Sequence, residues 1–392
     1  MICRISLLTA LATCSIVSAA PKFERQVIDD KIAIGYGLAI GDVDGDKKPD
    51  ILLADQHQIA WYRNGDWKRF EIAEHLNPPV GARHRDNVCI AARDIDGDGL
   101  VEIAVGGQWN PGETTDDTKS GSVHYLVRPK DPTQKWKPIK LHHEPTVHRM
   151  HWVRTGEKEF KLVVLPLHGR GNKKGEGAPV KVLAYDVPEN REDGKAWKTT
   201  VVDESMHMTH NFDMITNWLG KEKVREPMIF AGVEGARMAI PKETGWTHMD
   251  FPSRLIAGSG EIRHSDELIA AISPMHGNKV IAVRSDYIGA KTIDTTLNQG
   301  HALAIGDFLS LGKSSQQIIA GWRAPDKNGK VGIKLYVPKT KDIQGDWETH
   351  LIDDNGMACE DLKLADLDGD GKQDIIASGR ATKNVVIYWN KN

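Results

Sequence analysis

The stretch ADLDGDGKQDIIASG, Ala365 to Gly379, decides the fold. Its carboxylates occupy positions one, three, five and nine of a glycine-containing turn, and an apolar strand follows: Asp366, Asp368, Asp370 and Asp374. Carboxylates at this spacing suit Ca²⁺, which accepts about six to eight oxygen ligands in flexible geometry. An EF-hand loop would carry a bidentate Glu at position twelve, where this stretch has Ala377. The pattern therefore predicts a calcium-binding hairpin between two strands.

The same pattern occurs twice more, in AIGDVDGDKKPDILLAD (39–55) and AARDIDGDGLVEIAVGG (91–107). Four looser copies lie between residues 151 and 322 and bring the total to seven, spaced about 50 residues apart. Turns such as RTGEKEF keep the hairpin and discard the ligands, so we expect calcium to be structural rather than catalytic. The further candidate calcium ligands are Asp42, Asp44, Asp46, Asp50, Asp94, Asp96, Asp98 and Glu102.

Most copies continue into a third strand, such as QIAWYRN, and a fourth, such as WETHLIDD. Four antiparallel strands per repeat, without helical periodicity, predict an all-β, seven-bladed β-propeller. The last repeat ends at VVIYWNKN without a fourth strand, whereas FERQVIDD (23–30) precedes the first repeat and is similar to WETHLIDD. The N-terminal strand should therefore complete the last blade and close the ring. The repeats resemble the FG-GAP or VCBS type of integrin-like propellers, which implies this fold and almost nothing about function.

The first 19 residues carry one early Arg, an apolar run and small residues, and so predict a signal peptide followed by one propeller domain over residues 20–392. We expect a secreted or periplasmic protein. LATC, ending at Cys14, is similar to a lipoprotein cleavage site, but Thr13 disfavours lipid anchoring. No later segment is apolar enough to span a bilayer. Cys89 and Cys359, beyond the leader, should be buried free thiols.

The formal net charge is −3 and the basic residues are scattered, which argues against a nucleic-acid partner. The sequence indicates no particular oligomeric state.

Strand one of each blade should run along the channel towards the acidic turn, so its beginning lies on the opposite face. Counting six residues back from each turn selects one channel position per blade: Tyr36, Val88, His148, His210, Glu261, His301 and Glu360. Imidazoles and carboxylates converging from different strands suit Zn²⁺ or a similar transition metal. We expect His148, His210 and His301 to bind this metal, with Glu261 as a fourth ligand or as a base.

The ends of the second strands should add polar groups to the same mouth. His276 and His168 are candidate general bases or acids, and Arg170 and Arg323 could hold oxyanions or hydroxyls. A polar, oxygen-rich ligand such as a small carbohydrate would fit such a bowl.

VHRMHWV, MHMTHNFD, SGEIRHS, PMHGN and GHALAIGDF together resemble the propeller domain of aldos-2-ulose dehydratases, also called 1,5-anhydrofructose dehydratases. The resemblance implies a propeller-borne metal that helps eliminate water from a keto-sugar. The cupin domains of that family have no counterpart in this sequence, so their chemistry is not expected.

The chemistry also follows from the residues: a metal stabilises the enolate of a ketone while a base removes the adjacent proton, and a β-oxygen substituent then leaves. We therefore expect a carbon–oxygen lyase, either a dehydratase or a glycoside lyase acting on a keto-sugar or 3-keto-glycoside. The alternatives are a calcium-stabilised carbohydrate- or protein-binding propeller without catalysis, and a polysaccharide lyase.

Overall fold

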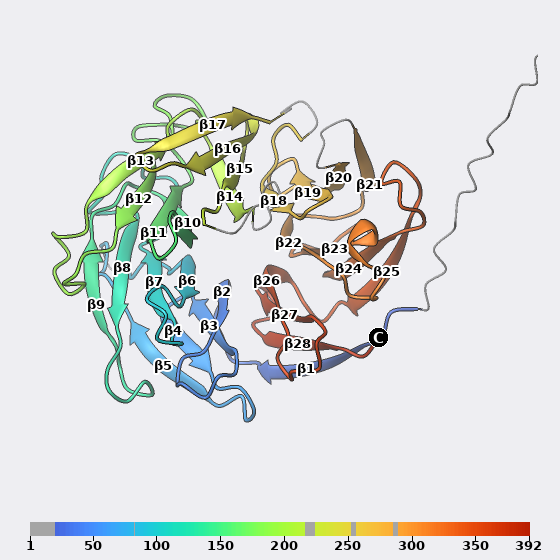
Figure 1. Cartoon of the computed structure of the whole chain (residues 1–392), viewed down its shortest axis with the longest axis horizontal. Coiled ribbons are helices and arrows are strands. Elements are labelled where there is room, and N and C mark those ends of the chain that lie inside the picture. The colour runs from blue at the N-terminus through green and yellow to red at the C-terminus, as the bar shows by residue number, and fades with distance from the viewer. Residues whose placement is uncertain (1–19, 82, 216–223, 252–255, 285–288) are drawn as a thin grey trace, which may run out of the picture.

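The computed structural model describes residues 20–81, 83–215, 224–251, 256–284 and 289–392. The expected signal peptide, residues 1–19, lies outside the described residues. The described residues form seven four-stranded antiparallel sheets arranged as a ring, so the predicted seven-bladed propeller is confirmed (Figure 1).

Each blade begins with its innermost strand. Blades 1 to 3 are β2 (Gly35–Gly41), β3 (Asp50–Asp55), β4 (Gln58–Tyr62) and β5 (Arg69–Glu74); β6 (Cys89–Arg93), β7 (Glu102–Gly107), β8 (Ser122–Val127) and β9 (Lys137–Leu141); β10 (Val147–Arg154), β11 (Phe160–Pro166), β12 (Val182–Asp186) and β13 (Thr199–Asp203). Blades 4 and 5 are β14 (Thr209–Met214), β15 (Met228–Gly232), β16 (Gly235–Pro241) and β17 (Trp246–Asp250); β18 (Glu261–His264), β19 (Leu268–Ser273), β20 (Lys279–Arg284) and β21 (Ala290–Asp294). Blades 6 and 7 are β22 (Gly300–Gly306), β23 (Gln317–Trp322), β24 (Gly332–Pro338) and β25 (Trp347–Asp354); β26 (Cys359–Ala365), β27 (Asp374–Gly379), β28 (Val385–Asn390) and β1 (Phe23–Asp29). Within the described ranges the helical structure is a single 3₁₀ turn, η3 (Lys313–Ser315).

The N-terminal strand β1 closes the ring, as predicted. It pairs antiparallel with β28, from Phe23 opposite Asn390 to Asp29 opposite Val385. Arg25 on β1 also forms an ion pair of 3.2 Å with Asp353 on blade 6. The closing strand thereby covers the edge of β28, which would otherwise present unpaired backbone groups.

Hydrophobic clusters fill the spaces between neighbouring blades. Between blades 7 and 1, for example, Leu38 and Leu53 pack with Ile376 and Ile387. The described residues contain one such cluster for each of the seven blade interfaces. Burying each of these aliphatic side chains contributes about 1.5–3 kcal/mol, so the ring is held together by its interfaces.

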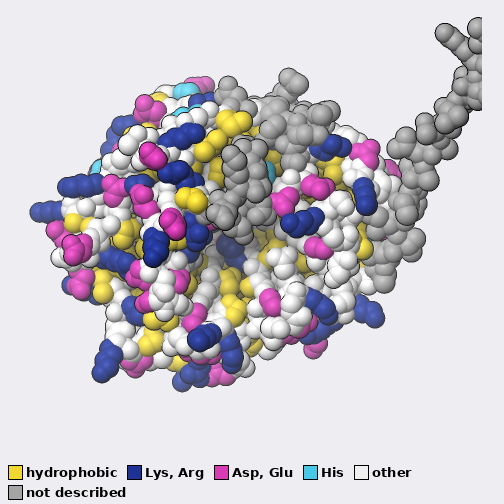
Figure 2. Space-filling view, viewed as in Figure 1, with side chains coloured by type: hydrophobic (Ala, Val, Ile, Leu, Met, Phe, Trp, Pro, Cys, Tyr) yellow, Lys and Arg dark blue, Asp and Glu magenta, His cyan; other side chains and the backbone are white. Residues whose placement is uncertain are grey.

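Cys89 and Cys359 are buried free thiols, as expected. Acidic and basic side chains are mixed over the face seen in Figure 2, without a large basic patch. In the described part of the chain no helix has the length and apolar character needed to cross a membrane.

Candidate functional site

The channel mouth on the face away from the acidic turns is built by a repeated irregularity of the innermost strands. In five blades the pairing of strands one and two skips one residue, which marks a β-bulge. The skipped residues are Tyr36, His148, His210, His301 and Glu360. A bulge redirects a side chain relative to a regular strand. Five of the seven positions selected by counting back from the turns therefore share a local conformation as well as a place in the ring.

The backbone fixes the protonated nitrogen of the three ring histidines. Nδ1 of His148 lies 2.7 Å from the carbonyl oxygen of His210, and Nδ1 of His301 lies 2.5 Å from that of Glu360. Nδ1 of His210 lies 3.1 Å from the carbonyl oxygen of Gly260. Because a carbonyl oxygen can only accept, each Nδ1 carries a hydrogen and each Nε2 keeps a lone pair. This is the arrangement in which metal-binding histidines are usually oriented.

Three imidazoles converge at this mouth: His210, His276 and His301. One ring nitrogen of each lies within 4.8 Å of the other two, and Nε2 of His210 is 2.7 Å from Nε2 of His276. His276 comes from the turn between β19 and β20, where its φ of 52° is unusual for a residue other than glycine. The group therefore combines two bulge residues with a residue from a strained turn.

Burial keeps these imidazoles neutral. It lowers the pKa of His301 and His148 well below the ordinary value, and the nearby Arg323 and Arg149, respectively, lower it further. Burial, followed by the field of His210, lowers the pKa of His276 to about 2. Neutral imidazoles present lone pairs instead of repelling a cation, so the donor set fits a divalent transition metal such as Zn²⁺.

His148 and Glu261, two predicted ligands, flank this group. The His148 ring lies 4.5 Å from the His210 ring, and its Nε2 is 3.3 Å from Nη1 of Arg149. Oε1 of Glu261 is 3.0 Å from Nδ1 of His210, and its Oε2 accepts a 2.6 Å hydrogen bond from Asn211. Burial alone would raise the pKa of Glu261, but contact with His210 and the field of Arg263 outweigh it and lower the pKa. Glu261 is thus a buried carboxylate behind His210.

An arginine–glutamate network forms the next part of the mouth. Nη1 of Arg323 donates to both carboxylate oxygens of Glu360 at 2.8 Å, and Nη1 of Arg380 donates to Oε1 at 3.1 Å. The Arg380 guanidinium also lies over the Tyr36 ring, 5.3 Å from its centre. Arg323 therefore lies at the mouth, as predicted, beside the partner carboxylate Glu360.

His168 and Arg170 take part in a different set of interactions, on blades 2 and 3. The backbone of His168 is hydrogen-bonded to Oγ1 of Thr146. Arg170 forms ion pairs of 3.0 Å with both Asp117 and Glu144. The guanidinium of Arg170 is therefore already neutralised by two carboxylates.

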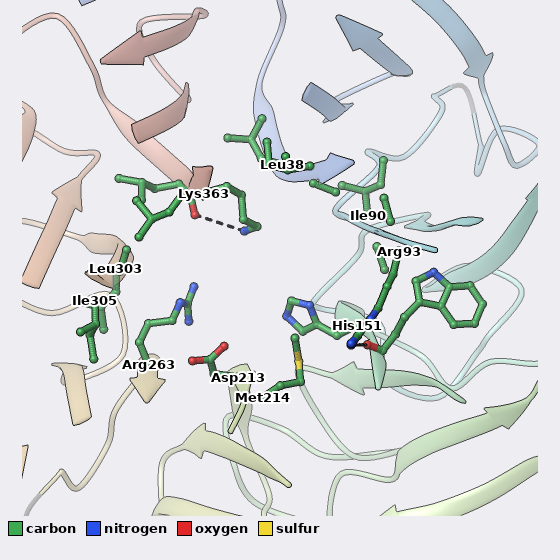
Figure 3. Close-up of a pocket in the computed structure, with 18 of the residues that line it drawn as sticks. Leu38, Ile90, Arg93, His151, Asp213, Met214, Arg263, Leu303, Ile305 and Lys363 are labelled. Atoms are coloured by element: carbon green, nitrogen blue, oxygen red, sulfur yellow. Dashed lines mark hydrogen bonds between the residues drawn. The ribbon is translucent and has the colours of Figure 1, made fainter. Parts of the chain in front are cut away.

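The channel also contains a cavity of about 380 Å³ on the acidic-turn side of the histidine mouth. All seven innermost strands line it. Figure 3 shows aliphatic walls and, between them, the side chains of Arg93, His151, Asp213, Arg263 and Lys363. Nη2 of Arg263 also lies 3.5 Å from Oε2 of Glu261. Arg263 therefore joins this cavity to the carboxylate behind His210.

The three acidic turns form compact carboxylate groups at the opposite end of the blades. In each turn, ligand atoms of positions one, three and nine lie within 4.8 Å of one another: Asp42, Asp44, Asp50; Asp94, Asp96, Glu102; Asp366, Asp368, Asp374. Position five lies outside these groups: Asp46, Asp98 and Asp370. One carboxylate oxygen of each accepts a backbone N–H two residues further on, as position three also does.

The turns also differ from one another. Arg191, from the loop between β12 and β13, forms ion pairs with Asp96 at 3.0 Å and Glu102 at 3.2 Å. Burial raises the pKa of both Asp50 and Glu102 to about 7. A cation in either turn would stabilise the ionised carboxylate.

Sequence reasoning overlooked three contributors to the mouth: Trp109, Arg149 and the acceptor role of Glu360. The Trp109 ring lies 4.9 Å from the His148 ring. Arg149 directly follows a predicted ligand, and Glu360 was placed on the channel without a partner. A search for arginine adjacent to ring positions would have found Arg149, whereas Trp109 lies in a loop that the repeat does not predict.

Comparisons with known proteins agree with this architecture. A model of the FG-GAP-like repeat matches residues 42–105, and a model of the aldos-2-ulose dehydratase β-propeller domain matches residues 120–283. The second match contains His148, His210, Glu261 and His276. No curated protein matches the chain.

Similar solved structures share the fold at low sequence identity. A structure of the mitotic checkpoint complex contains a chain that is 10% identical, with a TM-score of 0.58 and coverage of 100% of this chain and 98% of that chain. The extracellular domain of a putative one-component system from B. thetaiotaomicron is 10% identical, with a TM-score of 0.52 and coverage of 93% and 39%. The chain is thus a seven-bladed propeller with FG-GAP-like repeats that resembles the propeller domain of aldos-2-ulose dehydratase.

Proposed function

We propose that this protein is an exported, metal-dependent carbon–oxygen lyase that acts on a keto-sugar or 3-keto-glycoside. The observation that carries the proposal is the convergence of His210, His276 and His301 within 4.8 Å, with backbone carbonyls holding Nδ1 of His210 and His301. The three imidazoles would hold the cation, and Glu261 would hold the His210 ring. A bound divalent metal supplies a Lewis acid that makes a proton next to a substrate carbonyl easier to remove.

His148 is the best placed general base. Its Nδ1 hydrogen is held by the carbonyl oxygen of His210, so Nε2 is the nitrogen that can accept a proton. Burial, followed by the field of Arg149, lowers its pKa, which keeps the ring neutral and also weakens it as a base. Trp109 packs against the ring and would fix its orientation, whereas Nη1 of Arg149, 3.3 Å from Nε2, has to move aside before Nε2 takes up a proton.

Arg323 and Arg380 would bind the oxygen atoms of the substrate. Both are held by Glu360, and each guanidinium has more donors than this carboxylate uses. Donors fixed in advance stabilise an oxyanion without reorganisation, which makes elimination of water or of a sugar easier. We also propose that calcium in the three acidic turns stabilises the blades and takes no part in the reaction.

The first test is metal analysis of the purified protein. We expect about one transition metal per chain, as for a single catalytic site, and loss of that metal in the double variant His210→Ala with His301→Ala. His142→Ala removes an exposed histidine and is the matched control, which should retain the metal.

The second test is incubation with 3-keto-glycosides and 1,5-anhydrofructose, followed by the absorbance of a conjugated enone. His148→Ala should retain the metal and lose turnover. Calcium as the only bound metal, with no turnover of any keto-sugar, would contradict the lyase and favour a carbohydrate-binding propeller.

A further inference from the structure

A second hollow adjoins the histidine mouth between blades 1 and 2. It has a volume of about 490 Å³ and is called the Trp109 cleft below. Its principal lining residues are His75, Arg83, His84, Arg85, Asp86 and Trp109. Five of these six belong to the segment that connects β5 with β6, and Trp109 follows β7.

Two contacts join the Trp109 cleft to the proposed catalytic mouth. The Trp109 ring packs against the ring of His148 with 4.9 Å between centres. Oδ2 of Asp86 accepts a 2.7 Å hydrogen bond from the Tyr36 hydroxyl, and Tyr36 is one of the five bulge residues. A ligand could therefore reach both the cleft and the histidines.

The charge of the Trp109 cleft is unbalanced. Within the described residues, the guanidinium groups of Arg83 and Arg85 have no hydrogen-bond or ion-pair partner. The one carboxylate lining the cleft is Asp86, and it accepts from Tyr36 and, at 3.1 Å, from Gln56. The cleft thus offers donors to an anion and has little acceptor capacity of its own.

Two imidazoles line the cleft beside the arginines. Nδ1 of His84 is held by the carbonyl oxygen of Asn77 at 3.1 Å, and the His75 ring lies 4.1 Å from the His84 ring. The half-buried Trp109 adds an aromatic face next to the cationic groups. An aromatic surface beside a few polar groups is a common composition for a small-molecule site.

We propose that the Trp109 cleft binds an anionic substituent, a carboxylate or a sulfate, of the carbohydrate whose keto-sugar unit lies at the histidines. The inference rests on the proposed function and deepens it, because it makes the substrate an acidic saccharide. Arg83 and Arg85 hold the anion, since a guanidinium group can donate two parallel hydrogen bonds to a pair of oxygens of either anion. Trp109 packs against the adjoining sugar ring.

The test uses stable, non-keto probes, so that binding is measured without turnover. Calorimetric titration compares 4-nitrophenyl β-glucuronide, 4-nitrophenyl β-glucoside 6-sulfate and neutral 4-nitrophenyl β-glucoside. We expect one or both anionic probes to bind about tenfold more tightly than the neutral one, the gain typical of charge-assisted hydrogen bonds. The better anion identifies the substituent.

The double variant Arg83→Gln with Arg85→Gln should abolish this preference. The matched control, Lys130→Gln with Lys158→Gln, removes two positive charges from exposed turns on the acidic-turn face and should keep it. Equal affinity for all three probes, or a preference that survives the arginine substitutions, would overturn the proposal.

A third variant separates this inference from the proposed function. His210→Ala with His301→Ala removes the proposed metal ligands and should leave the preference for an anion unchanged. A protein without transition metal that still prefers anionic probes would refute the lyase alone. A metal-containing protein without the preference would refute the cleft assignment alone.

Discussion

Glu360→Gln tests the electrostatic network that shapes the mouth. The Glu360 side chain is only 2% exposed and accepts hydrogen bonds from Arg323 and Arg380. The substitution keeps the size of the side chain and removes the charge. The backbone carbonyl of Glu360, which holds Nδ1 of His301, is retained. The substitution therefore removes the charge that faces Arg323 and Arg380 and keeps the backbone hydrogen bond that orients His301.

The expected cost can be worked out from the exposure of the two partners. Removing one member of a buried ion pair costs about 3–5 kcal/mol when the other charge stays buried. The Arg323 side chain is 11% exposed and that of Arg380 is 38% exposed, so water compensates part of the loss at Arg380. We expect the free energy of unfolding to fall by about 2–3 kcal/mol, because Gln still offers one acceptor oxygen.

The assay is a double-mutant cycle of Glu360→Gln, Arg323→Gln and both together, followed by urea denaturation. Since the residues interact directly, the double variant should lose about 1.5 kcal/mol less than the sum of the single losses. Arg380→Gln is the internal comparison and should cost less than Arg323→Gln, because its guanidinium is more exposed. A Glu360→Gln protein as stable as the wild type, or strictly additive losses, would refute this account of the network.

Three further predictions concern the frame. Because burial raises the pKa of Asp50 and Glu102 to about 7, above the unfolded values, the calcium-free protein should lose thermal stability as pH rises from about 4 to about 7. Calcium should reduce this loss and Asp50→Asn should flatten it; a melting temperature independent of pH in chelator would contradict it. Arg191→Gln should raise the calcium affinity of the second turn about threefold or more by calorimetry, because Arg191 now occupies its carboxylates; unchanged affinity would count against such competition. Deleting β1 should lower the melting temperature and promote association through the exposed edge of β28, measured by light scattering; a stable monomer would show that closure is dispensable.

The sequence predicts the ring almost completely because a repeated hairpin constrains strand order, turn position and direction at once. The DxDGDG turns mark one end of each blade, and the pairing of FERQVID with VVIYWN follows from a missing fourth strand. Counting six residues back from a turn finds His148, His210 and His301 because the distance along strand one is fixed by the hairpin. The repeated pattern within each blade is enough to place these histidines, so contacts between residues far apart in the sequence need not be known.

The site is less predictable because the surroundings of its residues depend on loops that differ from blade to blade. The end of a second strand places His276 at the mouth, but its contact with His210 and the positive φ of its turn do not follow from the repeat. His168 follows strand two of blade 3, and Arg323 follows strand two of blade 6. Arg323 contacts the carboxylate of Glu360, whereas the backbone of His168 contacts Thr146. Equivalent positions in the repeat thus have different environments once the loops differ.

The bulges explain why a structural repeat can carry a functional site. A regular first strand would alternate its side chains between the two neighbouring blades, and both directions are filled by hydrophobic clusters. One extra residue per strand turns His148, His210 and His301 away from those clusters and towards the channel. The same insertion brings Nδ1 of His148 and His301 to the carbonyl oxygen of the bulge residue in the next blade, His210 and Glu360. The ring therefore supplies the position and the tautomer of its histidines together, and the chemistry depends on which residue occupies each bulge.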